Sequence, residues 1–98
     1  MKEKALKIIN NYGVMPQLKH FQSEVFELNE AIINAENNRL IGIGNNPSET
    51  AIKHIAEEIA DVMVMLYEFK EYYKISNEEI IDIMQYKINR QLQRMEEE

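Results

Sequence analysis

The stretch IAEEIADVMVML, residues 55–66, indicates a long amphipathic helix with acidic side chains beside its apolar face. On both sides of this stretch, apolar residues keep recurring every three or four positions, which is the spacing of one helix face. We expect the helix to span Pro47 to Tyr73. Its predicted core stripe consists of Ile52, Ile55, Ile59, Val62, Leu66 and Phe69.

Two helices are predicted before this one. Gly13 follows a short helical pattern and is typical of a helix end, and Pro16 suits the first turn of the next helix. We expect that second helix to reach about Glu36. The asparagine- and glycine-rich segment from Asn37 to Asn46 then predicts a loop, with Asn46 as the cap of the following helix.

The sequence Ser76-Asn77-Glu78-Glu79 matches a capping box, which predicts the start of a fourth helix. No alternating strand pattern or internal repeat is present. The expected fold is therefore a single all-α domain over residues 1–98, built as a four-helix bundle. Long amphipathic helices on so short a chain would leave apolar faces exposed in a monomer, which favours a homodimer or homotetramer.

The composition excludes several classes of protein. The net charge of −6 argues against a nucleic-acid polymer or an anionic membrane as the main partner. There is no cysteine, which excludes disulfide scaffolds and thiolate metal sites. The longest apolar run, Val62 to Leu66 with Tyr67, is far shorter than a membrane span. We expect a soluble cytoplasmic protein.

Four carboxylates form the candidate site. Glu24 and Glu27 lie three residues apart in the second predicted helix, and Glu58 and Asp61 have the same spacing in the third. This spacing puts each pair on one helix face, at the border of the apolar stripe. If the two helices pack antiparallel, the pairs face each other. Hard oxygen ligands that converge in this way suit Mg²⁺ or Mn²⁺.

Two other interpretations of these carboxylates remain open. The pairs could form a solvated acidic surface, or lysines could close them into a structural ion-pair network. His20 and His54 each precede a motif glutamate by four residues. They could orient a carboxylate or a water molecule, although such histidines are more often exposed helix residues.

The order of motifs resembles a known family. Gln17-Leu18 is followed by Glu24-x-x-Glu27-Leu28 and Ala31-Ile32, and then by Glu57-Glu58-Ile59-Ala60-Asp61-Val62. Together with the ending Lys87-x-x-Arg90-x-x-x-Arg94, this order resembles MazG-like nucleoside triphosphate pyrophosphohydrolases, especially their short bacterial and phage forms. The resemblance covers nearly the whole chain.

The resemblance implies a Mg²⁺-dependent enzyme that hydrolyses a nucleoside or deoxynucleoside triphosphate to monophosphate and pyrophosphate. It implies that Glu24, Glu27, Glu58 and Asp61 are the metal ligands and the catalytic residues. A carboxylate of the cluster, such as Glu24 or Glu27, could accept a proton from the attacking water. The sequence does not assign that role to one residue.

The basic residues near the end of the chain are candidates for binding phosphate. Lys87, Arg90 and Arg94 fall within about 60° of one another on the fourth predicted helix. Arginine forks and a lysine point charge suit phosphate oxygens. The alternative is a solvated surface that pairs with Glu97 or Glu98.

The chain departs from the family in one respect. Some relatives place a substrate-contacting asparagine on the third helix, whereas this chain has none between Asp61 and Ile75 and carries Phe69 near that position. Recognition of the base and sugar must therefore differ from that in these relatives or come from elsewhere in the chain. Two rival functions remain: a non-catalytic helical interaction protein, and a family member that binds nucleotide or metal without turnover.

Overall fold

The computed structural model describes residues 1–40 and 47–98, and in this part of the chain the regular structure is entirely helical. The helices are α1 (Lys2–Tyr12), α2 (Val14–Leu40), α3 (Glu49–Tyr72) and α4 (Asn77–Glu97). The predictions of an all-α chain and of four helices are confirmed. None of the described helices combines the length and the hydrophobicity that crossing a membrane requires.

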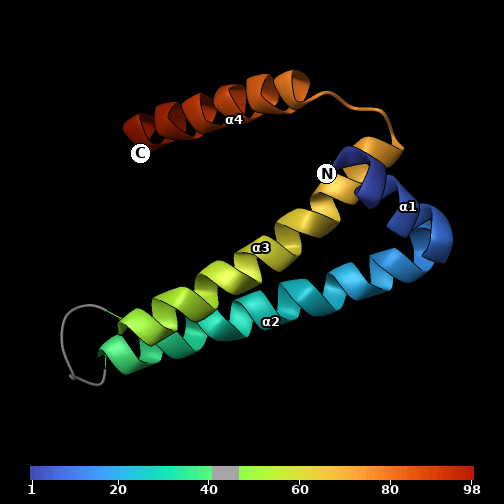
Figure 1. Ribbon diagram of the computed structural model, residues 1–98. Helices are drawn as coiled ribbons and strands as arrows, with labels where there is room; N and C mark the ends of the chain where they lie inside the picture. Colours follow the sequence, from blue (N-terminus) through green and yellow to red (C-terminus); the bar gives the residue numbers. More distant parts are fainter. Residues whose placement is uncertain (41–46) are drawn as a thin grey trace.

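The two longest helices, α2 and α3, lie side by side and antiparallel, and α1 packs where α2 begins and α3 ends (Figure 1). Side chains on all three helices form a small core. On α2 its members are alanines, which allow close approach of α3. The buried apolar residues are Ala5, Ile9, Ala31, Ala35 and Met65.

The second helix is longer than its sequence predicts. Residues 37–40, expected to begin a loop, continue α2 to Leu40. Asparagine costs a helix only a fraction of a kcal/mol per residue, so a pair of asparagines does not end it. The remainder of the predicted loop and the expected cap Asn46 lie outside the described residues.

The third helix begins two residues later than predicted. Ser48 is its N-cap, and the Ser48 hydroxyl accepts a hydrogen bond from the backbone N–H of Ala51 at 3.1 Å. The capping residue predicted for α4 is confirmed, because the Ser76 hydroxyl accepts from the backbone N–H of Glu79 at 3.1 Å. Both serines satisfy amide groups that a helix start leaves unpaired.

A tight turn separates α3 from α4. The backbone N–H of Ile75 donates to the carbonyl of Lys70, and that of Lys74 donates to Glu71. This pair of bonds is the Schellman arrangement, which needs a left-handed residue after the helix. Lys74 fills that position with a φ of 58°. The turn therefore ends α3 firmly and sends the chain in a new direction.

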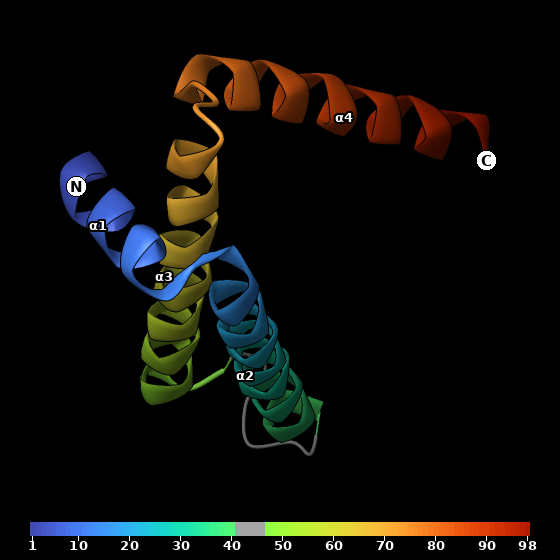
Figure 2. The same ribbon diagram turned by 90° about the vertical axis from the view of Figure 1, so that its right-hand side faces the viewer.

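Helix α4 leaves the rest of the molecule after this turn (Figure 2). Among the described residues it makes no packing contact with α1, α2 or α3, and every residue from Ile81 to Glu98 is exposed. A single chain thus does not form a closed bundle. Its apolar residues Ile81, Met84, Ile88, Leu92 and Met95 all remain accessible.

The surface area measures how open the single chain is. A compact monomer of 11.6 kDa would expose roughly 5,800 Å², whereas this chain exposes 8183 Å². The radius of gyration of 17.0 Å likewise exceeds the value of about 13 Å for a compact chain of this length. The excess of about 2,300 Å² is large enough for a permanent interface with another chain.

Candidate metal centre

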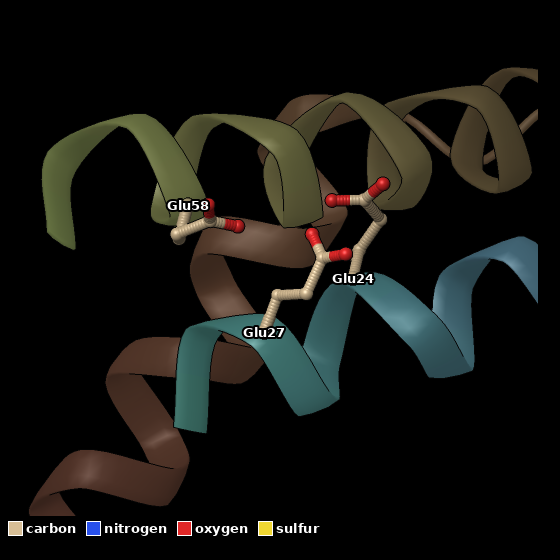
Figure 3. A group of neighbouring side chains, drawn as sticks. All are labelled: Glu24, Glu27 and Glu58. Atoms are coloured by element: carbon tan, nitrogen blue, oxygen red, sulfur yellow. The ribbon is translucent and has the colours of Figure 1, made fainter. Parts of the chain in front are cut away.

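Three of the four predicted carboxylates converge between α2 and α3. Glu24, Glu27 and Glu58 each offer one oxygen, and these oxygens lie within 4.8 Å of one another. Figure 3 shows the two α2 glutamates and the α3 glutamate directed into the same space. The i, i+3 spacing on α2 and the antiparallel packing of α3 produce this convergence.

Two of these carboxylates are unusual in their hydrogen bonding. The side chains of Glu24 and Glu58 are 13% and 12% exposed. Their Oε2 atoms are fully shielded from solvent and have no hydrogen-bond partner among the described residues. A buried carboxylate oxygen without a partner costs free energy, so an arrangement that carries two of them is suited to a cation.

The other oxygen of each buried glutamate lies near a histidine. Nε2 of His20 is 3.2 Å from Oε1 of Glu24, and Nδ1 of His54 is 3.9 Å from Oε1 of Glu58. The first distance fits a hydrogen bond, whereas the second is too long for one. The i, i+4 spacing noted in the sequence therefore places each histidine beside one oxygen, while the other oxygen is shielded from solvent and has no partner among the described residues.

The electrostatics of Glu24 reflect this crowding. Burial raises the pKa of the Glu24 carboxyl above its ordinary value, and the negative charges of Glu27, Asp61 and Glu58 raise it further. His20 acts in the opposite direction and lowers the pKa. A divalent cation among these groups would offset the repulsion between them.

Asp61 lies at the edge of the cluster. It is exposed and is outside the set of three converging glutamates, but its charge acts on Glu24, and both residues line one groove between α1, α2 and α3. The structure thus brings Glu24, Glu27 and Glu58 together with Asp61 beside them.

The predicted phosphate-binding residues do not reach this centre within one chain. Lys87, Arg90 and Arg94 are exposed on α4, which packs against none of the helices that carry the carboxylates. Figure 1 shows α4 directed away from the middle of α2 and α3. If these residues bind a phosphate held at an acidic centre, that centre belongs to another chain.

Two polar residues without an assigned role also lie at the site. Gln17 and Glu68 are buried, and Nε2 of Gln17 donates to Oε1 of Glu68 at 2.7 Å. The sequence contains a signal for them: Gln17 precedes Glu24 by seven residues, and Glu68 follows Asp61 by seven. A separation of seven residues keeps two side chains on one helix face.

Comparison of the chain with protein-family models, with curated proteins and with solved structures gives no match. The resemblance to MazG-like enzymes consequently rests on the spacing of the motifs alone.

Proposed function

We propose that the protein is a Mg²⁺-dependent nucleoside triphosphate pyrophosphohydrolase of the MazG-like type, with Mn²⁺ as an alternative cofactor. The observation that supports this most is the pair of shielded, unpartnered Oε2 atoms of Glu24 and Glu58 within the carboxylate cluster. All the donors are carboxylate oxygens, the ligands that Mg²⁺ and Mn²⁺ prefer.

In this proposal Glu24, Glu27, Glu58 and Asp61 hold the cation. The bound cation would supply charge neutralisation for the phosphates and would acidify water. A glutamate of the cluster accepts the proton of the attacking water, and cleavage of the α–β anhydride gives monophosphate and pyrophosphate.

The proposal includes a homodimer or homotetramer. The extra surface of the single chain and the exposed apolar face of α4 support assembly. They also give the basic residues a place to act, because Lys87, Arg90 and Arg94 of one chain would bind the phosphates held by another. Each site would then need two chains.

The test is a screen of nucleoside triphosphates with Mg²⁺ that measures pyrophosphate and phosphate separately. Calorimetry of Mg²⁺ or Mn²⁺ binding provides a second readout, in which Glu58→Gln should weaken binding strongly. Glu57→Gln is the matched control, because Glu57 is the exposed neighbour and lies outside the cluster. Equal binding by the wild type and Glu58→Gln would refute the metal centre.

A second function is favoured by one observation, the unpacked apolar face of α4. A non-catalytic protein could use this face to bind a partner helix. That function, like a family member that binds nucleotide or metal without turnover, predicts no Mg²⁺-dependent release of pyrophosphate. The same screen distinguishes it from the enzyme.

A further inference from the structure

A groove extends from the carboxylate cluster toward α1. It has a volume of about 540 Å³, which lies in the range typical of small-molecule sites. Glu24 and Asp61 line it near the cluster, and its other lining residues include Gln17, Glu68 and Tyr12. The groove therefore combines the candidate metal ligands with a second polar group that the proposed function does not use.

The second polar group is the hydrogen-bonded pair of Gln17 and Glu68. These residues are 7% and 2% exposed, so both are more than nine-tenths buried. A carboxylate only accepts hydrogen bonds and has about four lone-pair positions, of which Nε2 of Gln17 uses one. Because burial of a carboxylate is costly unless it is hydrogen-bonded, Glu68 favours a ligand that donates.

The separation of the two polar groups fits one nucleotide. Seven residues along α3 from Asp61 to Glu68 correspond to roughly 10 Å along the helix axis. That separation is comparable with the reach of a base from its α-phosphate. The rest of the wall includes the apolar side chains of Ile8 and Met65 together with His20 on α2, and the exposed ring of Tyr12 offers a face for stacking.

We propose that this groove binds the base of the nucleotide, and that Glu68 selects bases with an exocyclic amino group over uracil and thymine. The inference rests on the proposed function for the position of the phosphates. An amino group of cytosine, adenine or guanine donates to the carboxylate. Uracil and thymine have no amino group, and their single donor, the ring N3–H, lies between two carbonyl oxygens, so an acceptor would lie against the carboxylate where the other bases place a donor.

Gln17 supports this selection by orienting the carboxylate of Glu68. Its bond to Glu68 fixes the amide and leaves one N–H and the carbonyl oxygen for a ring atom of the base. A site that is built to pair a donor rejects an analogue without it far more strongly than a purely apolar site does. Glu68 is therefore a specificity-determining residue that touches the base, and Gln17 both positions it and pairs the base.

The experiment measures binding of nucleoside monophosphates in the presence of Mg²⁺, and because these contain no anhydride the result does not depend on hydrolysis. The full chain, labelled with ¹⁵N, is titrated with dCMP, dAMP, dGMP, dUMP and dTMP. We expect the side-chain amide signal of Gln17 to move. At least one of the three amino-bearing nucleotides should bind ten-fold or more tightly than dUMP and dTMP. Equal affinities for the two classes would overturn the inference, as would a Gln17 amide signal that none of the nucleotides moves.

Two variants separate recognition from folding. Glu68→Gln should bring the affinities of the two classes within about three-fold of each other. If it unfolds, the exchange variant Gln17→Glu/Glu68→Gln keeps an amide–carboxylate bond, and its base preference should also change. A folded variant of either kind with the wild-type preference contradicts the inference. Glu57→Gln, outside the groove, should keep that preference.

The outcomes also separate this inference from the proposed function. Base-selective binding without Mg²⁺-dependent pyrophosphate release would support the groove and refute the enzyme. Pyrophosphate release that is equally fast for all bases would support the enzyme and refute the role of Glu68.

Discussion

The ring of Phe21 on α2 meets the ring of Phe69 on α3 edge to face, with centroids 5.8 Å apart and an interplanar angle of 86°. Some MazG-like enzymes carry a substrate-contacting asparagine near the position of Phe69. In this chain the position serves to join α2 to α3. Substrate recognition in the proposed enzyme therefore needs other residues, and Gln17 and Glu68 are available for it.

The contact between the two rings predicts a measurable coupling. In a double-mutant cycle of Phe21→Leu and Phe69→Leu, we expect a coupling free energy of about 1 kcal/mol, because edge-to-face pairs stabilise beyond their buried area. Urea unfolding at one fixed protein concentration measures it. Strictly additive effects would show that the rings pack independently.

The raised pKa of Glu24 predicts how pH acts on the metal-free protein. In the unfolded chain Glu24 has the ordinary pKa of 4.5, whereas in the folded state its pKa is higher. The contribution of Glu24 to the stability of the fold is therefore present below pH 4.5, and it is lost as the pH rises through the pKa that Glu24 has in the folded state. Glu24→Gln should therefore stabilise the metal-free protein at pH 7 and have little effect at pH 4.

At pH 7, Mg²⁺ should make the wild type more stable than Glu24→Gln, because it binds the folded wild type and stabilises it by mass action. Thermal unfolding at pH 4 and 7, with and without Mg²⁺, measures both effects. Glu30→Gln, at an exposed position on α2, is the control and should follow the wild type. A Glu24→Gln protein less stable than the wild type at pH 7 without metal would contradict the electrostatic explanation.

The exposed stripe of α4 predicts an oligomer that one charge can disrupt. Ile88 is 57% exposed in the single chain, and a glutamate there would be buried without a partner in an interface. We expect Ile88→Glu to shift the mass measured by light scattering toward 11.6 kDa at micromolar concentration. Gln93→Glu adds the same charge on the far side of α4 and should preserve the oligomer. A wild type already at the monomer mass would refute assembly.

The basic residues of α4 predict a kinetic effect without a structural one. Arg90→Ala should lower kcat/KM for the triphosphate ten- to hundred-fold, because a charge-assisted contact is worth roughly 1.5–3 kcal/mol. Metal affinity and oligomer mass should be unchanged. Asn89→Ala, at the adjacent position on another face, is the control. Unchanged kinetics in both Arg90→Ala and Lys87→Ala would show that the basic residues of α4 form only a solvated surface.

The turn after α3 predicts a stabilising substitution. Lys74 has a φ of 58°, a conformation that costs a residue with a side chain about 1 kcal/mol and glycine little. Lys74→Gly should therefore increase the free energy of unfolding by about that amount in urea. Lys53→Gly, within α3, should lower it by a similar amount. A loss of stability in Lys74→Gly would mean that the lysine side chain supports the turn.

The sequence predicted the elements of this structure better than their packing. The stripe from Ile52 to Phe69 identified α3, and the border position of Glu24 and Glu58 anticipated their convergence, because both follow from helix periodicity. The end of α2 was missed since Asn37 and Asn38 are only weak helix breakers.

The stripe on α4 could not be interpreted fully from the sequence. Periodicity shows that Met84, Ile88 and Met95 share a face, but it does not specify which chain covers that face. Glu68 was missed for a related reason. A glutamate on a helix is usually exposed, and its burial against Gln17 depends on a contact across 51 positions of the sequence.

The isolation of α4 has a consequence for how the protein folds. Residues 77–97 form a helix without tertiary support in one chain, and most of the stability of a protein helix comes from packing of its apolar face against other elements. If a second chain covers α4, its folding becomes a bimolecular step whose rate increases with protein concentration. Dilution would then melt α4 first, while α1, α2 and α3 remain paired.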